Sequence, residues 1–238
     1  MRKKQLYSFL VVIYSIVIPA VIVLTYWGNR TVTVIAEETP REYGTCIVID
    51  PGHGGEDGGA ISCTGIPESK YNLEISLKLD SMLHLMGYDT LMIRSDDTSI
   101  YVTGNSIAQK KVSDLKERVR IVNSTKNALL VSIHQNYFHE GQYSGAQIFY
   151  APTEGSRELA QKLQAAVIGT VNPGSSRKCK RAEGIYIMEH IDCTAVLIEC
   201  GFLSNWQEEA KLRSKDYQLK LCSVIASTLG NAINHDTV

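Results

Sequence analysis

The segment Cys46–Gly59, CIVIDPGHGGEDGG, joins a short apolar run to a turn that holds five glycines, one histidine and three acidic residues. The apolar run has the composition of a buried strand, and the glycines let the backbone of the turn adopt positive φ angles. In an open α/β sheet, ligands gather at the carboxyl ends of the strands. The turn around His53 is therefore a candidate site for chemistry, with room for a metal and a substrate to approach the backbone closely.

Short β-branched runs alternate with amphipathic helical patterns through the rest of the chain. The runs predicted as strands are CIVID (46–50), DTLMIR (89–94), LLVSIH (129–134), AQIFYA (146–151), GIYIM (184–188) and AVLIEC (195–200). Apolar spacings of three and four predict helical faces at Ile75, Leu79, Met82 and Met86, at Leu115, Val119 and Val122, at Leu159, Leu163, Ala166 and Val167, and at Leu221, Ile225 and Leu229. This alternation predicts an α/β fold with a largely parallel central sheet and helices on both faces.

The N-terminus has a different composition from the rest of the chain. Residues 5–29 carry no charge, and the run 6–24 is long enough to cross a bilayer. The basic start MRKK predicts a cytoplasmic N-terminus and export of the remainder of the chain. Residues 1–29 are thus expected to be a signal-anchor or a cleaved signal peptide, with processing near residues 34–36 as the alternative, and 30–44 a linker to a domain over 45–238.

The overall composition excludes some classes of protein. The chain has 24 basic and 25 acidic side chains, so no basic field indicates a nucleic-acid partner. Its 44% hydrophobic content is ample for a packed core. The six cysteines form no CxxC pair, and most are expected to be small buried hydrophobes, with their disulfide state undetermined.

Chemically active residues end several of the predicted strands. His53 comes after the first strand, His134 ends the LVSI run and Glu199 ends the VLI run, so all three are expected at one edge of the sheet. Two histidines and one carboxylate with an open fourth position are typical of catalytic zinc, and a second carboxylate near the bound water is needed as a base. The candidates for these two carboxylate roles are Asp50, Glu56, Asp57, Glu68 and Glu199, and spacing alone does not sort them.

Four blocks of the sequence resemble one enzyme family. The blocks VIDPGHGGEDGGA, ESKYNLEISLKL, SIHQN and VLIECGFLSN, in this order, resemble the zinc-dependent N-acetylmuramoyl-L-alanine amidases of bacterial cell walls. The resemblance implies one Zn²⁺ per chain held by His53, Glu68 and His134, with Glu199 as the catalytic base. It makes 45–238 a catalytic zinc amidase domain that hydrolyses the amide between muramic acid and L-alanine of the stem peptide.

The short architecture is similar to that of the CwlD-type subgroup, the germination-specific amidases of the spore cortex, which prepare muramic acid for conversion to its δ-lactam. Action outside the cytoplasmic membrane, anchored or secreted, is then expected. The implied partners are the peptidoglycan stem peptide and glycan strand, the membrane through the N-terminal segment, and an activating protein. The aperiodic stretch Ser95–Ser113 is a candidate lid or docking site for that protein, or a plain surface excursion.

Further residues around these blocks have candidate roles. Asp50 is expected either to orient a histidine ligand or to satisfy the amides of the glycine turn. Arg94 is a candidate for binding a stem-peptide carboxylate, and Gln135, where the family often has alanine, for altering how the substrate seats. The basic loop 177–181 is a candidate for holding acidic groups of the substrate or is merely solvated.

Two alternatives to a zinc amidase remain open from the sequence. A cysteine peptidase would use Cys200 as nucleophile and His134 as base, and would survive a chelator. A membrane-tethered peptidoglycan-binding protein would hold metal without turnover, and the substitution Glu199→Gln would leave its biological activity unchanged.

Overall fold

The computed structural model describes residues 44–235. The predicted segment 1–29 and all but the last residue of the predicted linker 30–44 lie outside the described residues. Within the described part of the chain, no helix combines the length and the apolar character needed to cross a bilayer.

A six-stranded sheet forms the centre of the domain, with the order β2-β1-β3-β6-β4-β5. Its strands are β1 Cys46–Pro51, β2 Asp89–Met92, β3 Ala128–Asn136, β4 Gln147–Tyr150, β5 Lys180–Arg181 and β6 Thr194–Phe202. Neighbouring strands are parallel except for β4, which runs antiparallel to β6. The predicted largely parallel sheet is confirmed.

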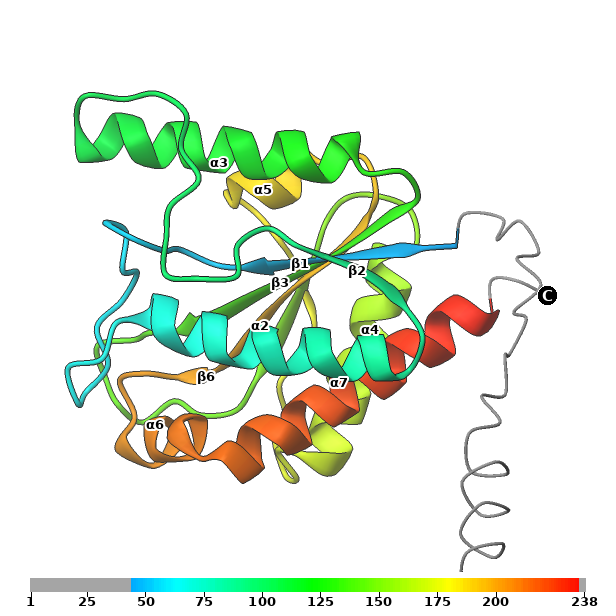
Figure 1. Ribbon diagram of the computed structural model, residues 1–238. Helices are drawn as coiled ribbons and strands as arrows, with labels where there is room; N and C mark the ends of the chain where they lie inside the picture. Colours follow the sequence, from blue (N-terminus) through cyan, green and yellow to red (C-terminus); the bar gives the residue numbers. More distant parts are fainter. Residues whose placement is uncertain (1–43, 236–238) are drawn as a thin grey trace, which may run out of the picture. The chain divides into compact units, whose positions relative to one another are not determined.

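Helices pack against both faces of the sheet, as predicted (Figure 1). One face is covered by α2 Glu68–Leu85, α4 Ser156–Thr170, α6 Trp206–Arg213 and α7 Lys215–His235, and the other by α3 Ile107–Ser124 and α5 Tyr186–Glu189. Each face has its own buried apolar cluster. The larger cluster lies under α2, α4 and α7, and the smaller one lies under α3 and α5.

The alternation of side chains along the strands decides which residues can meet. In β3, Val131 packs into the larger cluster and Leu130 into the smaller one, and β6 repeats this with Ile198 and Leu197. Because side chains two apart share a face, His134 and Glu199 project from the α3 side of the sheet. The sheet therefore presents both residues to the same layer of the molecule.

Several details differ from the sequence predictions. The run GIYIM was expected to be a strand, which is wrong, because Tyr186–Glu189 forms the short helix α5. Its buried residues Ile187 and Met188 are adjacent rather than alternating, which a five-residue apolar window does not reveal. The helix α2 begins at Glu68, which is seven residues before Ile75, the first residue of the predicted apolar face.

The stretch Ser95–Ser113 is shorter as a loop than expected. The helix α3 begins at Ile107, so its first two turns take up the second part of this stretch. The side chain of Ser106 accepts a hydrogen bond from the backbone amide of Gln109 at 3.3 Å, a cap that fixes the start of the helix. Only residues 95–106 thus remain available as a loop.

Candidate metal centre

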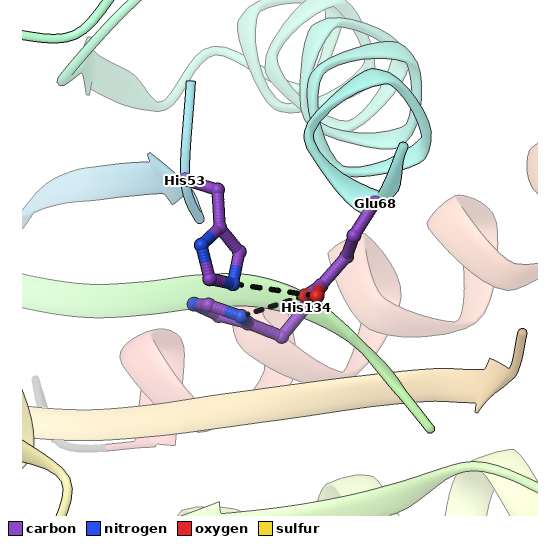
Figure 2. A group of neighbouring side chains, drawn as sticks. All are labelled: His53, Glu68 and His134. Atoms are coloured by element: carbon purple, nitrogen blue, oxygen red, sulfur yellow. Dashed lines mark hydrogen bonds and ion pairs between the residues drawn. The ribbon is translucent and has the colours of Figure 1, made fainter. Parts of the chain in front are cut away.

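Two histidines and one glutamate from three separate elements meet at the carboxyl edge of the sheet (Figure 2). His53 lies in the turn after β1, Glu68 is the first residue of α2, and His134 lies near the end of β3. Their ligating atoms all fall within 4.8 Å of one another. Glu68 bridges the pair, because its Oε2 lies 3.3 Å from Nε2 of His53 and its Oε1 lies 3.0 Å from Nδ1 of His134.

The carboxylate of Glu68 is held in place by groups besides the histidines. It accepts hydrogen bonds from the backbone amides of Ala60 and Gln135, both at 3.1 Å, and from the side chain of Asn72 at 3.3 Å. Burial acts to raise its pKa, but the hydrogen bonds to His134 and His53 outweigh burial and lower the pKa. Glu68 is therefore ionised and oriented, as a metal ligand must be.

His53 has a backbone conformation that is uncommon for a residue with a side chain. Its φ of 60° lies in the left-handed region. Its Nδ1 donates to Oδ2 of Asp57 at 3.0 Å, which leaves Nε2 directed at the cluster. Although burial lowers its pKa, the hydrogen bonds to Asp57 and Glu68 raise the pKa of His53 to about 9.

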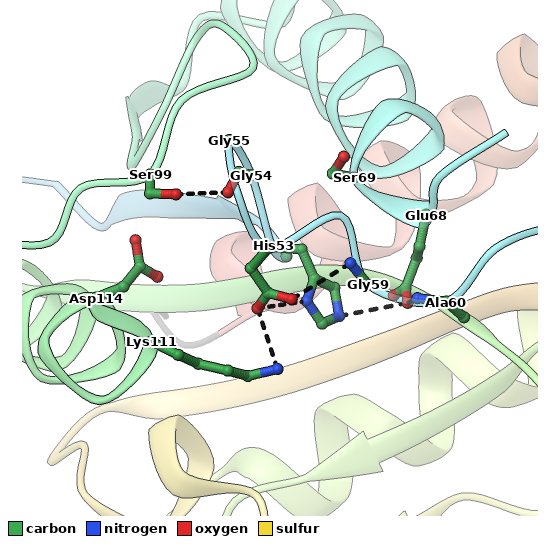
Figure 3. A network of polar contacts seen from close by, with 12 residues as sticks. His53, Gly54, Gly55, Gly59, Ala60, Glu68, Ser69, Ser99, Lys111 and Asp114 are labelled. Carbon is green, nitrogen blue, oxygen red and sulfur yellow. Dashed lines mark hydrogen bonds and ion pairs between the residues drawn. The ribbon is translucent and has the colours of Figure 1, made fainter. Parts of the chain in front are cut away.

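Asp57 is fixed in turn by two further contacts. It pairs with Nζ of Lys111 at 3.1 Å and accepts from the backbone amide of Gly59 at 3.3 Å. Figure 3 shows Lys111 extending from α3 toward this turn. A carboxylate behind a ligand histidine sets the orientation of the ring and raises its basicity, so Asp57 supports the cluster from outside.

The glycines of the turn make space for the ligands. A Cβ on Gly52 would lie 2.1 Å from Nε2 of His134, and a Cβ on Gly59 would lie 2.6 Å from Oε2 of Glu68. Gly59 also has a φ of 70°, which favours glycine. The glycine-rich sequence around His53 is thus explained by close approach of the backbone to the side chains of His134 and Glu68.

Glu199 lies beside this cluster with an unsatisfied oxygen. It lines a pocket of about 240 Å³ together with His53 and His134. Its Oε2 is buried and forms no hydrogen bond within the described residues, and burial raises the pKa of Glu199 to about 7. A buried carboxylate with a free oxygen and a near-neutral pKa has the properties of a general base.

The comparisons with known proteins agree with this geometry. The chain matches Amidase_3, the N-acetylmuramoyl-L-alanine amidase family, over residues 47–231. It belongs to this family. The germination-specific N-acetylmuramoyl-L-alanine amidase of Bacillus subtilis is 35% identical over 183 residues, which cover 76% of this chain and 77% of that protein.

Solved amidase structures share the fold. The CwlD amidase of Clostridioides difficile, solved in complex with the GerS lipoprotein, has a TM-score of 0.77 and 34% identity, covering 80% of this chain and 99% of that chain. An N-acetylmuramoyl-L-alanine amidase of Clostridium difficile 630 has a TM-score of 0.70 and 31% identity, covering 80% of this chain and 97% of that chain.

In this amidase, Asp50 has neither of the roles expected from the sequence. Its buried carboxylate pairs with the guanidinium of Arg118 and accepts from the hydroxyl of Ser132 at 2.7 Å, and within the described residues it forms no hydrogen bond to His53 or His134. Arg118 also donates to the carbonyl oxygens of Pro51 at 3.0 Å and His53 at 2.8 Å. Arg118, which the sequence analysis missed, therefore ties α3 to the turn that carries His53.

Arg94 is buried in the amidase rather than exposed at a strand end. Its guanidinium donates to the carbonyl oxygens of Pro51 at 2.9 Å, Gly52 at 3.0 Å, Ser69 at 3.1 Å and Asp96 at 2.8 Å. Because these carbonyls engage its donors, Arg94 supports the glycine turn, and the geometry gives no support to the expected contact with a substrate carboxylate.

Gln135 also lies away from the pocket that Glu199 lines. Its side chain is buried on the opposite side of the strand from His134 and donates to Oδ1 of Asn72 at 3.2 Å. The geometry gives no support to the expected influence on substrate seating. The backbone amide of Gln135 instead donates to Oε1 of Glu68 at 3.1 Å.

The structure removes the basis for the cysteine peptidase. Cys200 is fully buried in the apolar cluster on the opposite face of the sheet from Glu199, and burial raises its pKa well above the usual value. A thiol that is inaccessible to substrate and stays protonated cannot act as a nucleophile. All six cysteines are free, but only Cys200 and Cys222 are buried, so the expectation that most are buried is wrong.

Proposed function

We propose that this amidase hydrolyses the bond between N-acetylmuramic acid and L-alanine with a Zn²⁺ held by His53, Glu68 and His134, and with Glu199 as the base. The observation that carries this proposal is the buried, unpartnered Oε2 of Glu199 beside a cluster of two histidines and one carboxylate. Three such protein ligands with one position left open form the donor set of catalytic zinc, so the residues present fit this metal.

The residues of the chain have separable tasks in the reaction. When bound, the metal supplies Lewis-acid polarisation of the scissile carbonyl and lowers the pKa of water. Glu199 accepts a proton from the attacking water and delivers it to the amine nitrogen of L-alanine as the C–N bond breaks. Asp57 keeps Nε2 of His53 directed at the cluster throughout. No side-chain nucleophile takes part.

The biological setting is inferred from the relatives. Similarity to a germination-specific amidase and to CwlD supports action on the spore cortex, outside the cytoplasmic membrane. The complex of CwlD with a lipoprotein supports an activating protein partner for this chain. Loop 95–106 remains a candidate docking site, and residues 1–29 remain a candidate anchor or signal peptide. Unchanged partner binding after replacement of the loop would count against that docking site.

One paired measurement tests the proposal. Zinc content and release of stem peptides from muropeptides are measured on the full chain, for the wild type, for Glu199→Gln and for the surface control Glu117→Gln. We expect about one zinc per chain in all three and peptide release only from the wild type and the control. Equal release by Glu199→Gln would overturn its role as base.

The same experiment also tests the alternative that the chain binds peptidoglycan without hydrolysing it. If all three proteins bind zinc and none releases peptide, addition of extract from sporulating cells separates a missing activator from a binding protein. Activity that appears in the extract with the wild type but not with Glu199→Gln supports the amidase. Continued inactivity supports a peptidoglycan-binding role.

A further inference from the structure

A groove of about 1050 Å³ lies on the domain outside the residues used so far. Four cationic residues and a single acidic one line it, and we call it the basic groove: Arg177, Lys178, Lys180, Lys211 and Glu208. The acid is already neutralised, because the buried carboxylate of Glu208 accepts from the backbone amide of Gly145 at 2.7 Å and pairs with Lys211 at 3.2 Å. A chain with a net charge of −1 thus concentrates positive charge in one concave surface.

The basic groove begins one strand away from Glu199. Gln147, which lines the groove, is the Cα partner of Glu199 in the antiparallel pair β4 and β6. Directly paired residues project from the same face, with Cβ atoms about 5 Å apart. The groove therefore starts beside the strand that carries Glu199, and it extends to Glu208 and Lys211 of α6.

The cations nearest this junction are held in position. Oε1 of Gln147 accepts from Arg177 at 2.9 Å, and its Nε2 donates to the backbone carbonyl of Lys178 at 2.8 Å. Arg177 also donates to the carbonyl of Ser144 at 2.7 Å and stacks over the ring of Phe202 at 4.6 Å. The side chains of Lys178 and Lys180 are exposed beyond this fixed base, where their ammonium groups can meet a ligand.

We propose that the basic groove binds the free carboxylates of the stem peptide and so orients the substrate across the metal centre. This inference rests on the proposed function. In the substrate of an amidase, the lactyl carboxyl is consumed in the scissile amide and the N-acetylated sugars are neutral, so the negative charges belong to the peptide. The basic groove is then the binding site for the stem peptide, which lies on the L-alanine side of the scissile amide bond.

The test uses one muropeptide in two forms, a disaccharide peptide with free carboxylates and the same compound with those carboxylates amidated. The full-length wild type is expected to prefer the free form by about fivefold in kcat/KM, mainly through KM, as two exposed charge pairs would give. The double variant Lys178→Gln/Lys180→Gln should lose this preference, and in the wild type the preference should shrink as salt is raised.

A matched control removes two charges elsewhere. Lys162 lies by the opposite edge of the sheet, and Lys220 lies on the exposed side of α7, so Lys162→Gln/Lys220→Gln should retain the preference. Equal rates for both substrates with the wild type, or a preference that survives in Lys178→Gln/Lys180→Gln, would overturn the proposal.

Failure of the proposed function gives a different result, which is no turnover of either substrate by the wild type. Binding then tests the groove alone. Calorimetry of the free acidic peptide with zinc-loaded Glu199→Gln should show affinity that falls about fivefold when Lys178→Gln/Lys180→Gln is added. An unchanged affinity would reject the groove as the peptide site.

Discussion

His134 and Glu199 are Cα partners on the adjacent parallel strands β3 and β6. The proposed metal ligand and the proposed base are therefore separated by one inter-strand spacing, about 4.8 Å, and project from the same face. The hydrogen-bond ladder of the sheet sets this separation, whereas His53 and Glu68 reach the same place from a turn and from a helix start. The position of His134 is thus fixed by the sheet, whereas the positions of His53 and Glu68 depend on the glycine turn and on the start of α2.

The substitution Gly52→Ala should damage metal binding without unfolding the protein. The added methyl would lie 2.1 Å from Nε2 of His134 and would displace that ring. We expect metal affinity to fall at least tenfold, with a stability loss of about 1–3 kcal/mol from overpacking. Chelator competition and chemical unfolding measure the two effects. Gly169→Ala is the control for metal affinity, because beyond the adjacent backbone of its own helix no atom lies within 4 Å of its added methyl.

The substitution Asp57→Asn should weaken metal binding while leaving all three ligands in place. Asp57 orients the ring of His53 through Nδ1, and loss of such a partner typically reduces metal affinity by about 10–100-fold. Glu56→Gln is the matched control in the same turn, since Glu56 pairs at the surface with Lys110. Equal zinc affinities of the two variants would contradict the role given to Asp57.

Metal uptake should release a proton near neutral pH. The pKa of His53 is raised to about 9 in the metal-free protein, so most molecules carry a proton there at pH 7 to 8. A ligand imidazole must be neutral, so apparent affinity should rise with pH and level off above about pH 9. Calorimetry in buffers of different ionisation enthalpy counts the protons. Uptake at pH 7.5 with no proton released would contradict this prediction.

The buried pair of Asp50 and Arg118 should matter more for stability than any surface pair. Removing one partner leaves an uncompensated buried charge, so Arg118→Met should cost about 3–5 kcal/mol of unfolding free energy. Denaturant unfolding measures the loss. Arg120→Met, which removes an exposed arginine two residues away in α3, should leave the midpoint unchanged.

The same pair should also affect the metal centre. Because Arg118 donates to the carbonyl of His53, Arg118→Met should lower metal affinity even under conditions where the variant is folded. A folded Arg118→Met variant that binds zinc as tightly as the wild type would show that α3 does not fix the turn.

The fold was largely predictable from the sequence because long periodic segments dominate it. Five of the strands and the faces of α2, α3, α4 and α7 could be inferred from apolar spacing alone. The short elements could not. The strand β5 consists of Lys180 and Arg181, both exposed, so it carries no apolar signal, and α5 is too short to show its period.

The members of the candidate metal cluster were predictable, but the residues that support them were not. Strand ends indicated His53, His134 and Glu199, whereas choosing Glu68 among five carboxylates required resemblance to a family. The sequence does contain a sign that Arg118 is buried. It stands three residues after Leu115 and four before Val122, on the buried face of α3. A cation at such a position indicates a buried partner.

The strand register of β3, β6 and β4 also separates two properties that selection can act on. His134 and the proposed base Glu199 are locked in the ladder, where a shift of one residue would turn every side chain to the other face. The cations of the basic groove belong to the irregular segment before β5, to the exposed edge strand β5 and to the last turn of α6, where substitution is tolerated more readily. Substitutions in the basic groove could thus change which stem peptides a descendant of this chain prefers, while the residues proposed for hydrolysis stay the same.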